Sequence, residues 1–187
     1  MIGAPRVLPI GEDHPVQPHS AYLASKFYGE QLVNIANNRG LLGASFRISA
    51  PIGPRMPHDR IVTIFLSRAL KGETIHLNGT GARRQDYVDV QDIASAVAQW
   101  MNRPVAGTFN IASGRAVSNI ELAECCIARL NSKSGIAFSG KPDPEDAVAW
   151  GISIDKARQA FDYVPRISIE NSILPIADEL RNTGTST

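Results

Sequence analysis

The stretch HSAYLASKFYGEQLV, residues 19–33, decides the fold, because it starts a helix and sets Tyr22 and Lys26 four residues apart. Ser20 is a suitable N-cap for that helix. Residues i and i+4 share one face of a helix, so the Lys26 ammonium can come within reach of the Tyr22 hydroxyl. A nearby cation favours the phenolate, which suits the pair to general acid/base chemistry. The alternative is a chance spacing on an ordinary helix surface.

Outward from this helix, strands alternate with helices, which favours an α/β fold. We expect strands over 43–49, 74–77 and 107–114, and helices over 20–38, 59–72, 92–103 and 118–131, with two more helical pieces from 152 and a frayed polar tail over 181–187. Gly72 is placed to end its helix, and Ser118 with Glu121 forms a capping box. Asp92 is the expected N-cap of its helix. The segment APIGPR, residues 50–55, should end the preceding strand, because two prolines and a glycine oppose continuation.

The bulk composition excludes several classes of protein. The 187 residues are 43% hydrophobic, carry a net charge of +1, and contain no Lys/Arg run, so neither a nucleic-acid surface nor a polybasic membrane patch is indicated. No apolar run is long enough to span a membrane, no signal peptide is visible, and the four histidines lack metal-ligand spacing. The adjacent Cys125 and Cys126 favour a reducing, cytoplasmic location. We therefore expect a small-molecule partner.

Five segments occur in an order that points to one family. They are YLASKFYGE, FRISAPIGPR, NGTGARRQDYVDVQDIASAV, GTFNIASG and AVSNIELAE, between residues 22 and 124. This order resembles the C-terminal three-fifths of extended short-chain dehydrogenases/reductases, the NAD-dependent epimerase/dehydratase family. The resemblance implies a partial Rossmann-type fold followed by a C-terminal substrate-binding region. It places the rest of a dinucleotide-binding domain at 1–58 and the substrate-binding region mostly at 59–187, with 86–112 returning to the first domain.

The resemblance also implies roles for individual residues. Tyr22 would move a proton to or from a substrate hydroxyl, and Lys26 would hold the nicotinamide ribose of NAD or NADP. Tyr22 and Pro51 would also contact the cofactor. The implied reaction is hydride transfer at a hydroxyl-bearing carbon, which ends as epimerisation, dehydration or reduction. Members of the family commonly form homodimers through the helix that carries Tyr22 and Lys26.

One expected motif is missing from the sequence. The family's glycine-rich phosphate loop has no counterpart, since GTGARR, residues 79–84, leads into DYVDV rather than into a helix. The family's catalytic serine or threonine would fall just before MIG, residues 1–3. We therefore expect a chain without the family's first two-fifths, which binds NAD poorly and is inactive alone. Such a chain would leave an apolar sheet edge and the outer face of the Tyr22 helix uncovered, which would favour pairing with another chain. The alternative function is a non-catalytic binding or interaction module.

The substrate class is open at this point. Nucleotide-sugar enzymes of the family have diphosphate-binding residues where this chain has Ala50, Gln85 and Asp143, which opposes a diphosphate substrate. Arg83 and Arg84, shifted by one or two positions, could partly restore binding. Trp150 either lines the substrate side or fills the core. The candidate substrate contacts are Ala50, Arg84, Gln85 and Trp150.

Several other polar and aromatic residues have structural explanations. We expect Arg47, at a strand end, to be structural. Asp86 and Asp92 flank a strand-to-helix turn, where carboxylates more often accept backbone hydrogen bonds than act as acids. Trp100 and Met101 are assigned to the packed face of their helix.

Overall fold

The structure is a computed structural model that describes residues 5–184, so the MIG step lies outside the described residues. Its helices are α1 (Ala21–Asn37), α2 (Ile61–Lys71), α3 (Val90–Asn102), α4 (Asn119–Arg129), α5 (Asp155–Phe161) and α6 (Ile169–Gly184). Its strands are β1 (Ala44–Ile48), β2 (Ala50–Ile52), β3 (Ile75–Leu77), β4 (Arg84–Asp89), β5 (Gly107–Ile111), β6 (Ala116–Ser118), β7 (Ile136–Phe138) and β8 (Ala149–Trp150). Pairs of consecutive strands lie between successive helices up to α5, so the chain has the α/β class that the sequence predicts.

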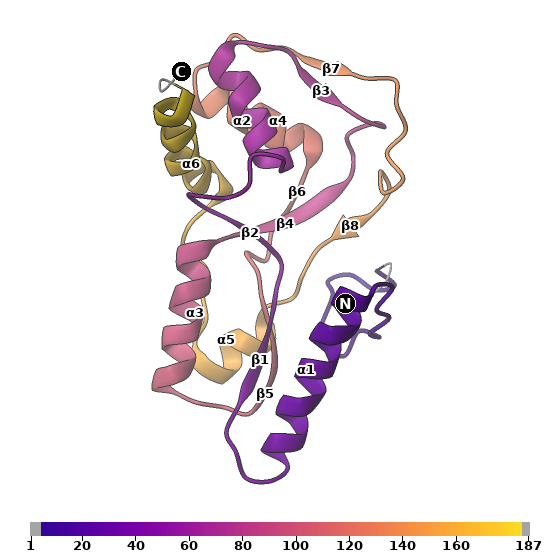
Figure 1. The fold of residues 1–187 in the computed structure, drawn as a ribbon, viewed down its shortest axis with the longest axis vertical. Helices are drawn as coiled ribbons and strands as arrows, with labels where there is room; N and C mark the ends of the chain where they lie inside the picture. The colour runs from indigo at the N-terminus through magenta and orange to yellow at the C-terminus, as the bar shows by residue number, and fades with distance from the viewer. Residues whose placement is uncertain (1–4, 185–187) are drawn as a thin grey trace.

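One half of the molecule is built on the parallel pair β1 and β5. Figure 1 shows α1 on one side of this pair and α3 with α5 on the other. Phe46 and Phe109 are paired across the two strands, and Phe161 of α5 meets Phe109 edge to face at 5.1 Å between ring centroids. Trp100 packs against Phe46 as expected of the packed face of α3. The assignment of Met101 to this packed face is wrong: Met101 is 66% exposed, because it is turned by about 100° around the helix from Trp100.

The other half packs α2, α4 and α6 into a second apolar core (Figure 1). Strand β3 pairs in parallel with β7, while β4 pairs with β2, β6 and β8. Strand β4 belongs to this half and leads directly into α3 of the first half. The division into domains at residue 58 stays a prediction.

Three sequence-based expectations about element boundaries are wrong. The segment APIGPR does not end the extended chain as expected. Its first three residues, Ala50–Ile52, form strand β2, which pairs with β4. Among the described strands β2 lies at an edge, where the missing N–H of Pro51 breaks no ladder. Helix α3 is capped by Asp89, which accepts a hydrogen bond from the Gln91 N–H at 2.7 Å, and not by Asp92. The expected frayed tail is helical through Gly184.

Local capping signals are confirmed. Ser20 accepts a hydrogen bond from the Leu23 N–H at the start of α1. Gly72 ends α2 in the left-handed region with φ 69°, and the capping box of Ser118 and Glu121 is complete at α4. No helix within residues 5–184 is long and apolar enough to cross a membrane.

Candidate functional site

A cavity of about 760 Å³ lies between α1 and β1, within the size range of small-molecule sites. Helix α1 forms one wall and residues 45–49 form another. Residues 10–11 and 150–152 belong to chain segments that run side by side through the parallel bridge of Ile10 and Ile152, and they help to complete the lining. The cavity is therefore assembled from segments far apart in the sequence.

Tyr22 and Lys26 lie together on the wall that α1 contributes. The Lys26 Nζ lies 5.2 Å from the centroid of the Tyr22 ring, and both side chains line the cavity. Tyr22 is 67% exposed, so its hydroxyl is accessible to a ligand. Gly29 and Val33 continue the same face of the helix, and a Cβ added at Gly29 would meet no atom within 4 Å. The pair thus faces open space rather than a packed core.

An ion pair at the base of the cavity fixes α1 against β1. The Arg47 Nη2 lies 2.7 Å from Glu30 Oε1, and its Nε donates to Glu30 Oε2 at 2.9 Å. Arg47 Nη1 also donates to the Glu12 carbonyl, and Glu12 accepts a hydrogen bond from the Asn110 N–H. The structural role expected of Arg47 agrees with this geometry. Sequence reasoning missed Glu30, although it follows Lys26 by one more helical turn.

The predicted substrate contacts divide into two groups. Gln85 and Trp150 line the same cavity as Tyr22 and Lys26. Ala50 instead packs against the second apolar core, and Pro51 is exposed on β2. Neither lines the cavity, so the structure does not bring the predicted cofactor contact Pro51 to the catalytic pair. The roles of all these residues stay predictions.

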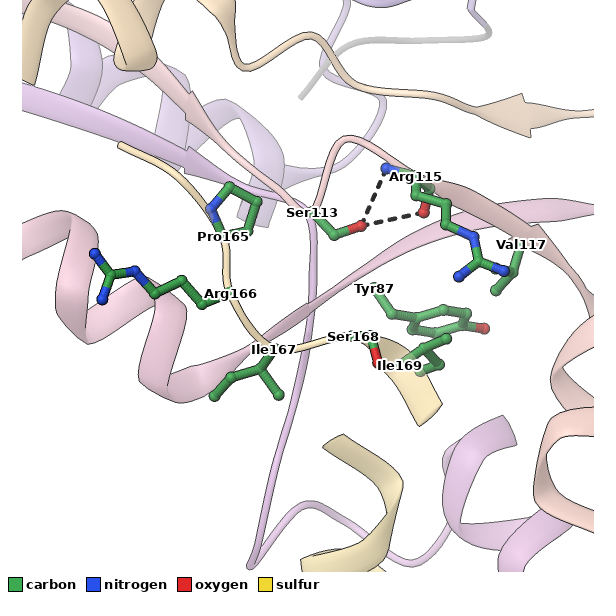
Figure 2. A pocket seen from close by; sticks show the side chains of 9 residues that line it. All are labelled: Tyr87, Ser113, Arg115, Val117, Pro165, Arg166, Ile167, Ser168 and Ile169. Carbon is green, nitrogen blue, oxygen red and sulfur yellow. Dashed lines mark hydrogen bonds between the residues drawn. The ribbon is translucent and has the colours of Figure 1, made fainter. Parts of the chain in front are cut away.

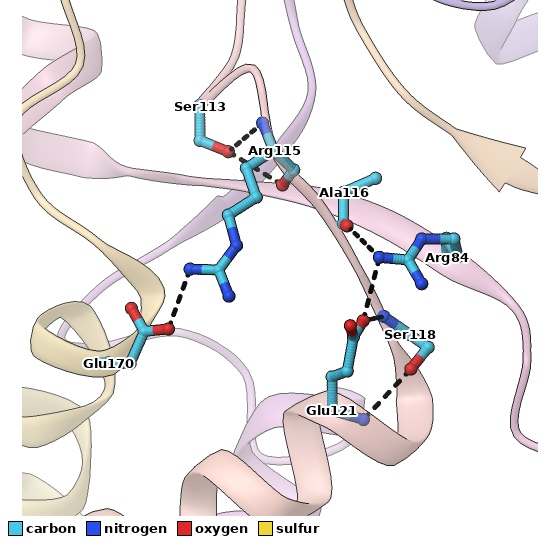
Figure 3. Close-up of polar contacts among 7 residues, drawn as sticks. All are labelled: Arg84, Ser113, Arg115, Ala116, Ser118, Glu121 and Glu170. Carbon is cyan, nitrogen blue, oxygen red and sulfur yellow. Dashed lines mark hydrogen bonds and ion pairs between the residues drawn. The ribbon is translucent and has the colours of Figure 1, made fainter.

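The arginines that could replace missing diphosphate partners are engaged elsewhere. Arg84 donates to the Ala116 carbonyl at 2.7 Å and pairs with Glu121 at 3.0 Å (Figure 3). Arg83 pairs with Glu145 at 2.6 Å. The carboxylate of Asp143 accepts a hydrogen bond from the Glu145 N–H. Neither arginine lines the cavity that holds Tyr22.

Asp86 lies inside β4 rather than beside a strand-to-helix turn, but it accepts backbone hydrogen bonds, as expected of it. It is fully buried and accepts hydrogen bonds from Ser113 N–H, Ser113 Oγ and Gly114 N–H at 2.7–2.9 Å. Burial raises the pKa of Asp86, while the Ser113 and Gly114 donors oppose that change. Asp92 likewise accepts from the N–H groups of Arg166 and Ile167, each at 3.0 Å.

Comparisons with known proteins agree on one family. The sequence profile of the NAD dependent epimerase/dehydratase family matches residues 1–112. A UDP-glucose 4-epimerase of Mycolicibacterium smegmatis is 30% identical over 96% of this chain and 59% of its own length. The structure of UDP-glucose 4-epimerase from Thermotoga maritima, solved with UDP-glucose, matches with a TM-score of 0.83 at 26% identity, over 95% of this chain and 59% of that one.

A further neighbour bears on the cofactor. The Thermus thermophilus UDP-glucose 4-epimerase, solved in complex with NAD, matches with a TM-score of 0.78 at 25% identity over 95% of this chain and 59% of its own. The Rossmann-type class expected from the sequence and a nicotinamide dinucleotide as the cofactor of such folds are thereby confirmed. This chain spans about three-fifths of the length of the relatives it matches.

Proposed function

Because the chain belongs to the NAD dependent epimerase/dehydratase family, we propose that it carries the acid/base half of a hydride-transfer site acting on a hydroxyl-bearing carbon. The observation that supports this most directly is the placement of Tyr22 and Lys26 against one another on the wall of an open cavity. Epimerisation, dehydration and reduction all share this step.

The residues present fit one end of the cofactor. Tyr22 and Lys26 would contact the nicotinamide ribose, and the slim face at Gly29 leaves room beside them. NAD or NADP, when bound, would supply the hydride acceptor or donor. The 187 residues hold no glycine-rich loop for the pyrophosphate. We therefore propose that this polypeptide alone binds the dinucleotide weakly and lacks activity.

The side chains of this chain would handle the proton. In the direction of oxidation the Tyr22 oxygen, as general base, would take the proton from the substrate hydroxyl, and in the reverse direction the Tyr22 hydroxyl would return it to the carbonyl oxygen. The Lys26 ammonium, held over the ring, stabilises negative charge on that oxygen. Glu30 and Arg47 keep the helix at its place beside β1, and thus position the pair.

The charges in the cavity favour a substrate without a diphosphate near Tyr22. Arg47 is neutralised by Glu30, and Lys26 lies over the Tyr22 ring. No further lysine or arginine lines the part of the cavity that the structure describes. A diphosphate is recognised best by bidentate cations. An uncharged carbonyl compound therefore fits better than a nucleotide sugar, and binding of UDP-glucose and of such a compound should be compared.

The catalytic proposal is tested with Tyr22→Phe, and with Tyr28→Phe as a matched control from the exposed side of the same helix. The assay polypeptide joins this chain to the part of the M. smegmatis relative that precedes the matched stretch, and hydride transfer is followed by NADH absorbance with a panel of sugars and carbonyl compounds. Loss of the acid/base group should lower the rate by roughly 10²–10⁴. Equal rates in the two variants would contradict the proposal. For the chain alone, saturable NADH binding at micromolar concentration would contradict weak binding.

We also propose that the chain forms the homodimer that the family resemblance implies. The second candidate function is a non-catalytic module that binds another protein. On the side of α1 away from the cavity, Tyr28, Leu32 and Ile35 are 65%, 47% and 49% exposed. A stripe of this kind is a candidate protein-binding surface. Sedimentation equilibrium should show self-association that Leu32→Glu weakens, and a monomer at all concentrations would contradict the dimer.

A cytosolic location is proposed from the cysteines. Cys125 and Cys126 are free, and burial raises the pKa of both thiols. Thiols of this kind persist in a reducing compartment. Alkylation at neutral pH should modify the half-buried Cys125 before the buried Cys126, and both more slowly than glutathione.

A further inference from the structure

A second, smaller cavity of about 210 Å³ lies in the other half of the molecule (Figure 2). Its lining comes from residues 113–117 on one side, residues 165–169 on the other, and Tyr87 of β4 between them. It shares no lining residue with the cavity of Tyr22 and Lys26. The function proposed above makes no use of it.

Two buried carboxylates hold the walls of this cavity in place. Asp86, 0% exposed, accepts the three hydrogen bonds from Ser113 and Gly114 described above. Asp92, 4% exposed, fixes the opposite wall through the N–H groups at 166 and 167. Walls held by buried, fully hydrogen-bonded groups are pre-organised, so a ligand would lose little free energy in ordering them.

Tyr87 borders this cavity with its ring (Figure 2), and its hydroxyl donates to no described residue. The hydroxyl oxygen is not itself buried, so it can donate to water or to a ligand in the cavity. Burial raises the pKa of Tyr87 to about 12. The phenol is therefore protonated at neutral pH and available as a donor.

A cation borders the same space. Arg115 Nη1 donates to Glu170 Oε1 at 2.9 Å, while its Nε and Nη2 donate to no described residue (Figure 3). In Figure 2 the hydroxyl end of Tyr87 lies on the same side as the Arg115 guanidinium, whereas the Arg166 side chain points away from the Tyr87 ring. The remaining wall is apolar and includes Val117 and Ile169.

We propose that this cavity is a binding site for a small organic carboxylate. Arg115 and Tyr87 would donate hydrogen bonds to the carboxylate, and the apolar part of the ligand would lie against Val117 and Ile169. Arginine recognises carboxylates with two parallel hydrogen bonds, and the two unused donors of Arg115 permit this. The cavity, of about 210 Å³, has room for a small organic acid. Glu170 occupies part of Arg115 and therefore competes with the ligand.

Butyrate is the probe for the test, added to the ¹⁵N-labelled 187-residue chain and followed by amide chemical shifts. Saturable shifts are expected at residues 113–117 and 166–169, and none at Tyr22 and Lys26. Butanol, which lacks the charge, and inorganic phosphate, which lacks the apolar part, should each bind at least fivefold more weakly. Phosphate binding as tight as butyrate would overturn the assignment of an organic carboxylate. No saturable shift with butyrate would overturn the site.

Variants distinguish the site from non-specific binding. Arg115→Gln should weaken butyrate at least tenfold and Tyr87→Phe about threefold, whereas Glu170→Gln should strengthen it about threefold by releasing Arg115. Arg158→Gln removes a similarly exposed arginine from an ion pair elsewhere and should change nothing. Amide spectra of each variant report whether it is folded. Unchanged affinity in the folded Arg115 and Tyr87 variants would refute the proposal without affecting the role of Tyr22.

Discussion

The ion pair of Glu30 and Arg47 is the perturbation that tests the architecture of the larger cavity most directly. Its side chains are only 6% and 14% exposed, and it is bidentate. Truncating Glu30→Ala leaves the largely buried Arg47 guanidinium with one remaining partner, the Glu12 carbonyl. Removing one member of a buried pair costs about 3–5 kcal/mol. In a chain of this size that loss corresponds to a fall in Tm of about 6–20 °C.

The measurement is thermal unfolding followed by circular dichroism, with urea unfolding for the free energy. Arg103→Ala is the matched control, because it breaks an ion pair with Asp162 that is 60% and 81% exposed and worth about 0–1 kcal/mol. The double variant Glu30→Met with Arg47→Met should recover most of the loss, since a buried pair replaced by apolar residues is often neutral. If Glu30→Ala costs no more than Arg103→Ala, the pair does not hold α1 in place.

Further changes test local features of the fold. Gly72→Ala should cost about 1–2 kcal/mol in urea unfolding, because φ is 69° and no atom lies within 4 Å of the added Cβ, so that only the backbone is strained. Ser118→Ala should cost about 1 kcal/mol by removing the N-cap of α4. The backbone N–H of Ser118, as the main cause, lowers the pKa of Glu121 in the folded chain. The contribution of Glu121 is therefore present at neutral pH and lost as the pH falls through that lowered pKa, and the stability difference from Glu121→Gln should shrink in acid. Tyr163→Phe should cost about 1–2 kcal/mol, since its hydroxyl donates to the buried Ala112 carbonyl at 2.9 Å.

Features set by neighbouring residues could be predicted from the sequence. The cap at Ser20, the left-handed Gly72 and the capping box at Ser118 each depend on a few residues, and all are confirmed. The facing of Tyr22 and Lys26 likewise follows from helical spacing alone. The misplaced N-cap at Asp92 is a local error of three residues, because Asp89 also suits that position.

Features that depend on distant partners could not be predicted. Asp92 binds backbone more than 70 residues away, and nothing in its own segment indicates residues 166–167. Arg84 is a candidate substrate contact in the sequence, but in the structure it forms an ion pair with Glu121 of α4. The pairing of β2 with β4 overrides the local signal of Pro51, because an edge position tolerates proline. These outcomes are set by tertiary contacts.

The two apolar cores are interleaved along the chain. Residues 44–46, 93–112 and 152–163 contribute to one, and residues 50–87, 117–136 and 169–180 to the other, so the polypeptide passes repeatedly between them. Neither half can be released by a single peptide-bond cleavage. A protease nick in an exposed loop should leave two fragments that stay associated. Calorimetry should show one heat-absorption peak rather than two, because the segments of each core are joined to one another through the other core, so that the two cores unfold together.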